Sequence, residues 1–284
     1  MSLPDNTVRP VQIVSGSSTT VFTGPNTFTL TLPRSGFQSN KDEVALKSLT
    51  CYYSWFNVSA DKQNNSFSYN WQGTNFPVVI ADGIWQFNEI MNYFQQVMEK
   101  NGHFLVDSDG VNQYYIEFIV NPQLYCLSLT ATPVPTSVPA GWSNPQGISL
   151  SGQTPQLVVS SVGFASLTGF IQGTYPASAQ TTLYQINSTI PQITDVSSIN
   201  ILCNLVDNSG FNLSPNVLTA FVVPSGQKPG SLITLQPFSP DYVPIKKDQT
   251  FETIQVSIVD QLMRPINIRD PVGFVMILNL RRRS

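Results

Sequence analysis

The sequence predicts an all-β fold, either an antiparallel sandwich or a jelly roll. Many short segments alternate apolar and polar residues and are separated by turns rich in proline and glycine. Only one segment has the periodicity of a helix. The C-terminal segment 272–280 is apolar on both faces, which predicts a central strand covered by a second layer. We therefore expect the C-terminus to close the fold.

The N-terminal part of the chain contains the first predicted strands. Residues 1–25 are polar and loosely patterned, so we expect an N-terminal arm. Residues 28–32 alternate apolar side chains with threonines and form the first predicted strand. Residues 43–57 form a long strand whose alternation changes phase. One extra residue near Lys47 or Ser48 would restore the face, which is the effect of a β-bulge.

One helix interrupts this series of strands. Predicted strands at residues 67–71 and 78–81 precede it. Residues 87–100 carry apolar side chains spaced three and four apart, and Gly102 follows as a C-terminal stop. We expect this helix to lie across the barrel, against the outer face of the central strand. Its apolar residues are Phe87, Ile90, Met91, Phe94, Val97 and Met98.

The second half of the chain is less regular. Strands are predicted within residues 114–130, but residues 131–146 hold four prolines and residues 147–190 have little pattern. We interpret 131–190 as an inserted loop or a small outward subdomain within one domain spanning 1–284. Alternation resumes in three predicted strands, at residues 199–205, 217–223 and 254–258, before the final strand.

Composition limits the classes of partner. Only 11% of the 284 residues are charged, and the formal net charge is -3 with a pI near 5.1. Such a surface tolerates close neighbours and has no general attraction for nucleic acid. Arg281, Arg282 and Arg283 form the one basic run, which we interpret either as a solvated tail or as a phosphate contact.

Cysteine usage and hydropathy indicate where the chain is made. Cys51, Cys126 and Cys203 lie singly within predicted strands, so we expect buried free thiols in a reducing compartment. No apolar run has the length of a membrane span, and residues 1–10 lack the apolar stretch of a signal peptide. We expect synthesis in the cytosol and no membrane span.

Residue patterns for catalysis or metal binding are missing from the sequence. The single histidine, His103, follows the helix and is interpreted as a surface turn residue. Asp107, Asp109 and Gly110 resemble the start of a calcium loop without its remaining ligands, so a simple turn is the better interpretation. We predict no enzyme activity, no cofactor and no metal site. Trp142, in the proline-rich stretch, is the one tryptophan expected to be free for a partner contact.

With these segments identified, the chain resembles the minor capsid (penton) proteins of virophages and Polinton-like viruses. The resembling segments follow one another along most of the chain. They are "EVALKSLTCYYSWFNVSADKQNNSFSY" (Glu43 to Tyr69), "IADGIWQFNEIMNYFQ" (Ile80 to Gln95), "LTGF" (Leu167 to Phe170), "SINILCNLV" (Ser198 to Val206) and "SIVDQLMRPINIRDPVGFVMILNLR" (Ser257 to Arg281).

The resemblance implies a fold, partners and a location. It implies a single jelly roll that forms homopentamers at the five-fold vertices of an icosahedral virion, surrounded by a double-jelly-roll major capsid protein and assembled in the host cytoplasm. We expect two four-stranded antiparallel sheets, with the last strand beside residues 27–32. Contact with nucleic acid is expected only through the C-terminal arginines.

The aromatic run 52–56 is the predicted subunit interface. Tyr53 and Trp55 should point inward, which leaves Tyr52 and Phe56 for a neighbouring subunit or for an overlying part of the chain itself. Two other interpretations compete with a capsid protein. They are a carbohydrate- or receptor-binding β-sandwich, such as a lectin or fibre head, and a secreted β hydrolase.

Overall fold

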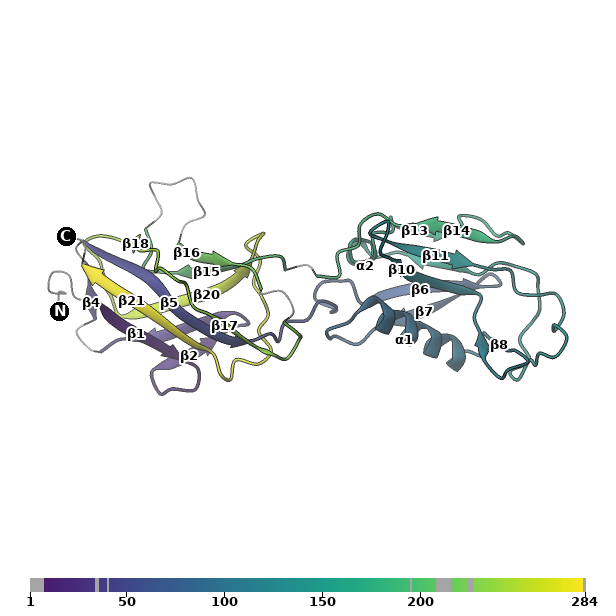
Figure 1. The fold of residues 1–284 in the computed structure, drawn as a ribbon, viewed down its shortest axis with the longest axis horizontal. Coiled ribbons are helices and arrows are strands. Elements are labelled where there is room, and N and C mark those ends of the chain that lie inside the picture. Colours follow the sequence, from purple (N-terminus) through teal and green to yellow (C-terminus); the bar gives the residue numbers. More distant parts are fainter. Residues whose placement is uncertain are drawn as a thin grey trace. The chain divides into compact units, whose positions relative to one another are not determined.

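The chain folds almost entirely as antiparallel β-sheets. The computed structural model describes residues 8–33, 36–39, 41–194, 196–207, 216–223 and 227–282. Within these residues there are two helices among many strands (Figure 1). The predicted all-β class is confirmed. The chain divides into two compact units, the first made of residues 1–55 and 196–284 and the second of residues 56–195.

The first unit contains two principal antiparallel sheets. One sheet is β1 (Arg9–Val14), β21 (Val275–Arg282), β5 (Asp42–Tyr52) and β17 (Leu232–Leu235), with β18 (Val243–Pro244) also paired to β5. The other is β16 (Val217–Phe221), β15 (Ile199–Cys203), β20 (Thr253–Asp260), β3 (Thr27–Thr31) and β2 (Thr20–Thr23). A short pair, β4 (Phe37–Gln38) and β19 (Thr250–Phe251), accompanies them.

The strand order of this unit is that of a jelly roll. Without the short additions β2 and β18, each principal sheet has four strands. Counted along the chain, the eight strands lie in the orders first-eighth-third-sixth and fifth-fourth-seventh-second. Strands from both ends of the sequence therefore alternate within each sheet, which is how two Greek keys build a jelly roll. The predicted jelly roll with two four-stranded sheets is confirmed.

The last strand is central, as predicted, but its neighbours differ from the prediction. β21 pairs with β1 and β5, whereas residues 27–32 lie in the other sheet beside β20. Part of the predicted arm 1–25 is therefore a paired edge strand. Its alternation was hard to recognise because Pro10 and Val14 share the outer side of the strand with Gln12, so the side opposite buried Ile13 is itself largely apolar.

The two faces of β21 are buried to different extents. Met276, Leu278 and Leu280 are buried in the core, while Val275 and Ile277 on the opposite face are only half-buried. Val272 is 72% exposed because it lies in the turn before the strand. The helix predicted to cover this outer face belongs to the second unit, where it packs on that unit's own sheets.

The predicted β-bulge is present in β5. Ile277 pairs with Ser48 and Leu278 pairs with Leu46, so Lys47 is the extra residue. The bulge keeps both Leu46 and Leu49 on the core side of the strand. Beneath this sheet the ring of Phe28 stacks on that of Phe274, with centroids 3.6 Å apart and planes within 6°.

The second unit has its own sheets and both helices. A four-stranded sheet has the order β13 (Gly173–Tyr175), β12 (Gln156–Val159), β6 (Ser66–Trp71) and β7 (Thr74–Val79). A three-stranded sheet consists of β10 (Ile116–Asn121), β11 (Cys126–Ala131) and β14 (Tyr184–Asn187). The remaining elements are α1 (Phe87–Lys100), α2 (Val162–Thr168) and the pair β8 (Leu105–Val106) and β9 (Asn112–Gln113).

Helix α1 forms where its periodicity predicts. Gln86 and Glu89 form a capping box at its start, and Gly102 follows the end with a φ of 76°. Its apolar face is buried, and Phe94 contacts Phe67 at 5.2 Å and Phe118 at 6.1 Å between ring centroids. These rings come from β6 and β10, so the helix completes the core of the second unit.

The inserted part is larger than the predicted segment 131–190. Residues 56–195 form one unit because β6, from before the helix, pairs directly with β12, from after the proline-rich stretch. The two ends of the unit meet where Asn57 Nδ2 donates to the carbonyl oxygen of Ile193 over 2.9 Å. The jelly roll thus receives a complete folded unit between its third and fourth strands.

Candidate interaction surfaces

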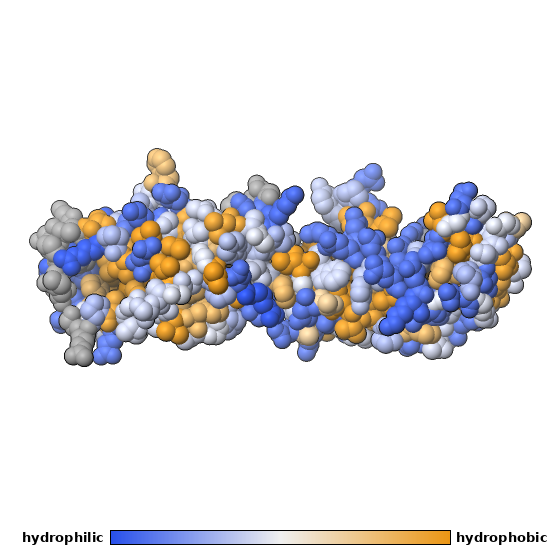
Figure 2. Space-filling model, turned by 90° about the horizontal axis from the view of Figure 1, so that it is seen from below, coloured by the Kyte–Doolittle hydropathy of each residue, from blue (hydrophilic) through white to orange (hydrophobic). Residues whose placement is uncertain are grey.

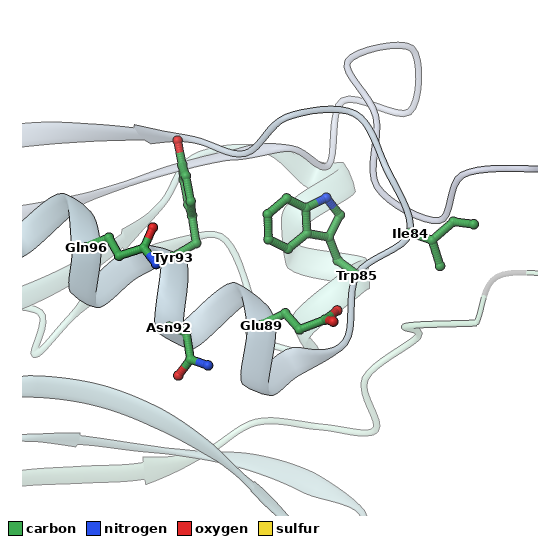
Figure 3. A pocket seen from close by; sticks show the side chains of 6 residues that line it. All are labelled: Ile84, Trp85, Glu89, Asn92, Tyr93 and Gln96. Carbon is green, nitrogen blue, oxygen red and sulfur yellow. The ribbon is translucent and has the colours of Figure 1, made fainter. Parts of the chain in front are cut away.

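The exposed side of α1 and the loop before it form a pocket in the second unit. Its volume is about 410 Å3. The helix contributes four of the lining residues, which lie on the side of α1 opposite to the face buried in the core. Figure 3 shows the side chains arranged around the front of the helix. The pocket is lined by Ile84, Trp85, Glu89, Asn92, Tyr93 and Gln96.

Internal hydrogen bonds hold the two aromatic rings of this pocket. Trp85 Nε1 donates to the carbonyl oxygen of Ala81 over 2.9 Å, and Tyr93 Oη donates to that of Val79 over 2.8 Å. The rings meet edge to face with centroids 5.8 Å apart. The side chain of Asn57 also bonds both the amide N–H and the carbonyl oxygen of Trp85, each over 2.8 Å. The rings are therefore held before any ligand arrives.

The jelly-roll unit has a second candidate surface on the outer side of its first sheet. Cys51 and Ile233 form a buried pair, so the adjacent pair, Tyr52 and Leu232, faces outward. Leu232 is 45% exposed and Tyr52 is half-buried. We call this surface the outer sheet face, and its apolar members are Val14, Tyr52, Leu232, Val275 and Ile277.

The predicted interface residues Tyr52 and Phe56 fall in different units. As expected, Trp55 is buried and Tyr53 packs on the core of the first unit. The Tyr52 ring lies over the turn before β21, where a Cβ added to Gly273 would be 2.9 Å from Cε2 of Tyr52. Phe56 is half-buried at the start of the second unit, and its carbonyl oxygen accepts a hydrogen bond from Lys62 Nζ over 2.6 Å.

Phe238 is a candidate contact that sequence reasoning missed. It is fully exposed in the loop between β17 and β18, with Pro237 and Pro240 close by. The loop has no alternation of apolar and polar residues. An aromatic residue between two prolines was nevertheless a usable signal of exposure, because prolines limit how such a loop can fold back. Apolar side chains also lie among polar ones elsewhere on the surface, as Figure 2 shows for one face.

Trp142 is less free than predicted. It is partly buried and packs against the hydrophobic core of the second unit, so it does not project from the proline-rich stretch. The stretch itself is held by Val134, which is buried, and by a backbone bridge between Ser143 and Val106. A partner could therefore reach only part of the indole.

The C-terminal arginines are partly engaged within the first unit. Arg281 makes an ion pair with Glu43, with Nη2 and Oε2 2.8 Å apart, and its guanidinium lies 3.6 Å from the centroid of the Tyr242 ring. Arg282 ends β21, and Arg283 lies outside the described residues. Arg281 is therefore part of the folded sheet, near the end of the central strand β21, which differs from the predicted solvated tail.

His103 is not the surface residue that was predicted. It is 8% exposed, its ring stacks on Trp71 at 4.5 Å, and its Nδ1 lies 2.7 Å from Tyr69 Oη. Burial lowers its pKa to about 4, so the imidazole is neutral near pH 7 and its Nδ1 shares a hydrogen bond with the tyrosine hydroxyl. The residue was misjudged because the chain turns back after α1 and places it under the β6–β7 hairpin, where its ring also meets Phe76.

Other chemistry-bearing groups serve local structure. Asp107 Oδ1 accepts from the backbone N–H groups of Asp109 and Val111, so the predicted turn is present, although it joins β8 and β9. Across the described parts of the chain, no three metal-ligating side chains gather, and no helix is long and apolar enough to span a membrane. All three cysteines are buried and unpaired, as predicted.

Comparisons with known proteins show similarity in structure and no match in sequence. No family model and no curated protein matches the sequence. Among solved structures, the chain is similar to the crystal structure of the selenomethionine-labelled penton protein of mavirus. The TM-score is 0.44 and the sequence identity is 11%, over 97% of this chain and 99% of that chain.

Proposed function

We propose that this chain is a structural subunit of an icosahedral capsid, a penton protein that forms homopentamers at the five-fold vertices. The observation that carries the proposal is the jelly roll of the first unit, in which the first and last strands pair at residues 9–14 and 275–280. Jelly rolls are common in viral capsid and lectin domains. Fold alone does not decide between these classes. The ordered resemblance of five segments to penton proteins favours the capsid.

The surface of the jelly-roll unit supports self-association. A five-fold ring uses two different faces of each subunit, because its contacts are heterologous. The outer sheet face supplies one apolar surface, and the loop carrying Phe238 supplies another exposed aromatic group. With 11% charged residues in the chain, few ionised groups would lose water when such faces meet. We propose Tyr52 and Leu232 as members of the subunit interface, and retain Phe56 as a further candidate.

Partners and location follow from the proposed role. The pentamer would sit in a shell of double-jelly-roll major capsid protein, in virions assembled in the host cytoplasm. No reaction is part of this role. Contact with nucleic acid is proposed only through the C-terminal arginines Arg281, Arg282 and Arg283.

The proposal is tested by measuring mass and by imaging particles. We expect sedimentation to give a pentamer, or a monomer that becomes a pentamer as concentration rises. Obligate contacts of this kind bury about 2,000 Å2 or more in total. Co-expression with the major capsid protein should place the chain at five-fold vertices in particle images. A chain that forms no five-fold ring, alone or in the shell, would contradict the proposal.

A matched pair of variants locates the interface. Leu232→Ser removes an apolar side chain from the outer sheet face and should weaken association about tenfold. Leu262→Ser changes the same residue type at an exposed turn after β20 and should leave association unchanged. The double change of Tyr52 and Phe56 to Ser should lower the pentamer fraction while the monomer keeps its circular dichroism. Equal pentamer fractions in all variants would remove this face from the interface.

A further inference from the structure

We infer that the pocket along α1 binds a short neutral carbohydrate. This inference goes beyond the proposed capsid role, because a vertex subunit needs no saccharide site to assemble. It rests on the pocket formed by Trp85, Tyr93, Glu89, Asn92 and Gln96. The volume of about 410 Å3 falls within the range of roughly 300–1,000 Å3 that is usual for small-ligand sites.

The pocket has one aromatic side and one polar side. In Figure 3 the rings of Trp85 and Tyr93 stand along the upper side, Glu89 and Asn92 lie along the lower side, and Gln96 closes one end. A sugar ring has the same division, because its C–H groups form an apolar face while its hydroxyl groups project around the edge. A pyranose lying along the helix would meet both kinds of group at once.

The aromatic side is prepared for stacking. The indole N–H and the phenol O–H already donate to the backbone at Ala81 and Val79. Both rings are half-buried against the core of the second unit, so a ligand would meet the part of each ring surface that stays exposed. C–H groups with partial positive charge are attracted to the negative face of an aromatic ring. Because both rings are held in place, little side-chain freedom is lost when a ligand binds.

The polar side carries unused hydrogen-bonding groups. Among the described residues, the side-chain amides of Asn92 and Gln96 make no hydrogen bond. Glu89 uses Oε2 to accept from the backbone N–H of Gln86, which leaves Oε1 for a ligand. An amide offers a donor and an acceptor side by side, and adjacent sugar hydroxyls present the matching pair.

The charge of the lining selects against anionic ligands. Glu89 is the one charged residue among the six that line the pocket, and no lysine or arginine is among them. A phosphate or a sialic acid would place its negative charge beside this carboxylate without a compensating cation. A neutral saccharide of one or two rings meets no such repulsion.

Saturation-transfer NMR on the full chain tests this inference. The probes are four neutral disaccharides, namely lactose, cellobiose, mannobiose and chitobiose, with sialyllactose as the anionic comparison. We expect saturation transfer to at least one neutral disaccharide and a shift of tryptophan fluorescence on titration. Sialyllactose, which adds a sialic acid to lactose, should bind no more tightly than lactose itself. Transfer to sialyllactose alone would overturn the neutral assignment.

Variants on the exposed helix face separate binding from folding. Asn92→Ala and Gln96→Ala should each weaken binding by about two- to tenfold, as expected for one lost hydrogen bond, and they keep the helix because alanine is a strong helix former. Asn88→Ala is the matched control, since Asn88 is exposed on α1 outside the pocket. Trp85→Ala should abolish binding.

Two outcomes would overturn the site. One is the absence of transfer to all four neutral disaccharides, and the other is binding that stays equal across the Asn92, Gln96 and Asn88 variants. Sedimentation of the same variants gives an independent result for the capsid proposal. A chain that binds sugar without forming pentamers, or forms pentamers without binding sugar, separates the two proposals.

Discussion

The two units bury their cores in different ways. The jelly-roll unit is closed by strands far apart in the sequence, since β1 and β21 lie at opposite ends of the chain and pair from Arg9–Leu280 to Val14–Val275. The second unit is continuous, and its core is assembled from rings on β6, β10 and α1. Closure by distant strands makes the first unit depend on both chain ends. Continuity should let the second unit fold without them.

Removing the last strand is the strongest test of this independence. Deletion of residues 275–284 takes the central strand from between β1 and β5 and removes three buried side chains, Met276, Leu278 and Leu280. We expect amide hydrogen exchange to show loss of protection throughout the first unit, while the second unit keeps its protection. The excised fragment 56–195 provides the reference pattern. Loss of protection in both units would show that they fold as one.

A core truncation in the second unit has the next largest expected effect. Phe94 is fully buried between Phe67 and Phe118, so Phe94→Ala should reduce the free energy of unfolding of this unit by about 3–5 kcal/mol. The matched control is Phe238→Ala, which removes a fully exposed ring from the first unit and should change stability by no more than about 0.5 kcal/mol. Chemical unfolding followed separately for each unit measures both. A loss below about 1 kcal/mol for Phe94→Ala would contradict its packing role.

The smallest expected effect is a pH dependence confined to the second unit. His103 has its pKa lowered by burial from 6.5 to about 4, so the unfolded chain binds a proton at a higher pH than the folded unit does. The contribution of His103 to the free energy of unfolding is therefore fully present above pH 6.5, decreases as the pH drops from 6.5 to 4, and stays constant below pH 4. The full shift corresponds to about 3 kcal/mol, and solvent screening reduces our expected loss to about 1–2 kcal/mol.

A single substitution isolates this effect. His103 is the only histidine in the chain, so subtracting the stability profile of His103→Gln removes the contributions of the carboxylates. The difference between the two stability profiles should change with pH between 6.5 and 4 for the second unit and should not change with pH for the first unit. A flat difference in the second unit would show that the imidazole is hydrated in the folded chain.

Local pattern was enough where the periodicity of a segment decides its structure. The phase change in residues 43–57 identified the bulge at Lys47, because a strand must keep one face toward the core. The spacing of Ile90, Met91, Phe94 and Met98 identified α1 and its buried face for the same reason. The two-sided apolar character of the last strand correctly placed it at the centre of a sheet.

The candidate sites were only partly predictable. Pattern placed Tyr53 and Trp55 inward, and the alternation of β5 implies that Tyr52 faces outward. The pocket was missed because its members come from a helix and the loop before it, and their exposed sides have no periodic signal. Phe238 was missed because its loop has no alternation, and the two nearby prolines were the one local signal that its ring would stay exposed.

By itself, the sequence determined the all-β class, the helix, the bulge and the central position of the last strand, since each depends on neighbouring residues along one element. Only the tertiary structure decided that β1 is the partner of β21, that β6 pairs with β12 across the proline-rich stretch, and that His103 is buried against Trp71. These features depend on contacts between residues distant in the chain. These contacts are stabilised by burying side chains that come from distant parts of the sequence, so no local pattern predicts them.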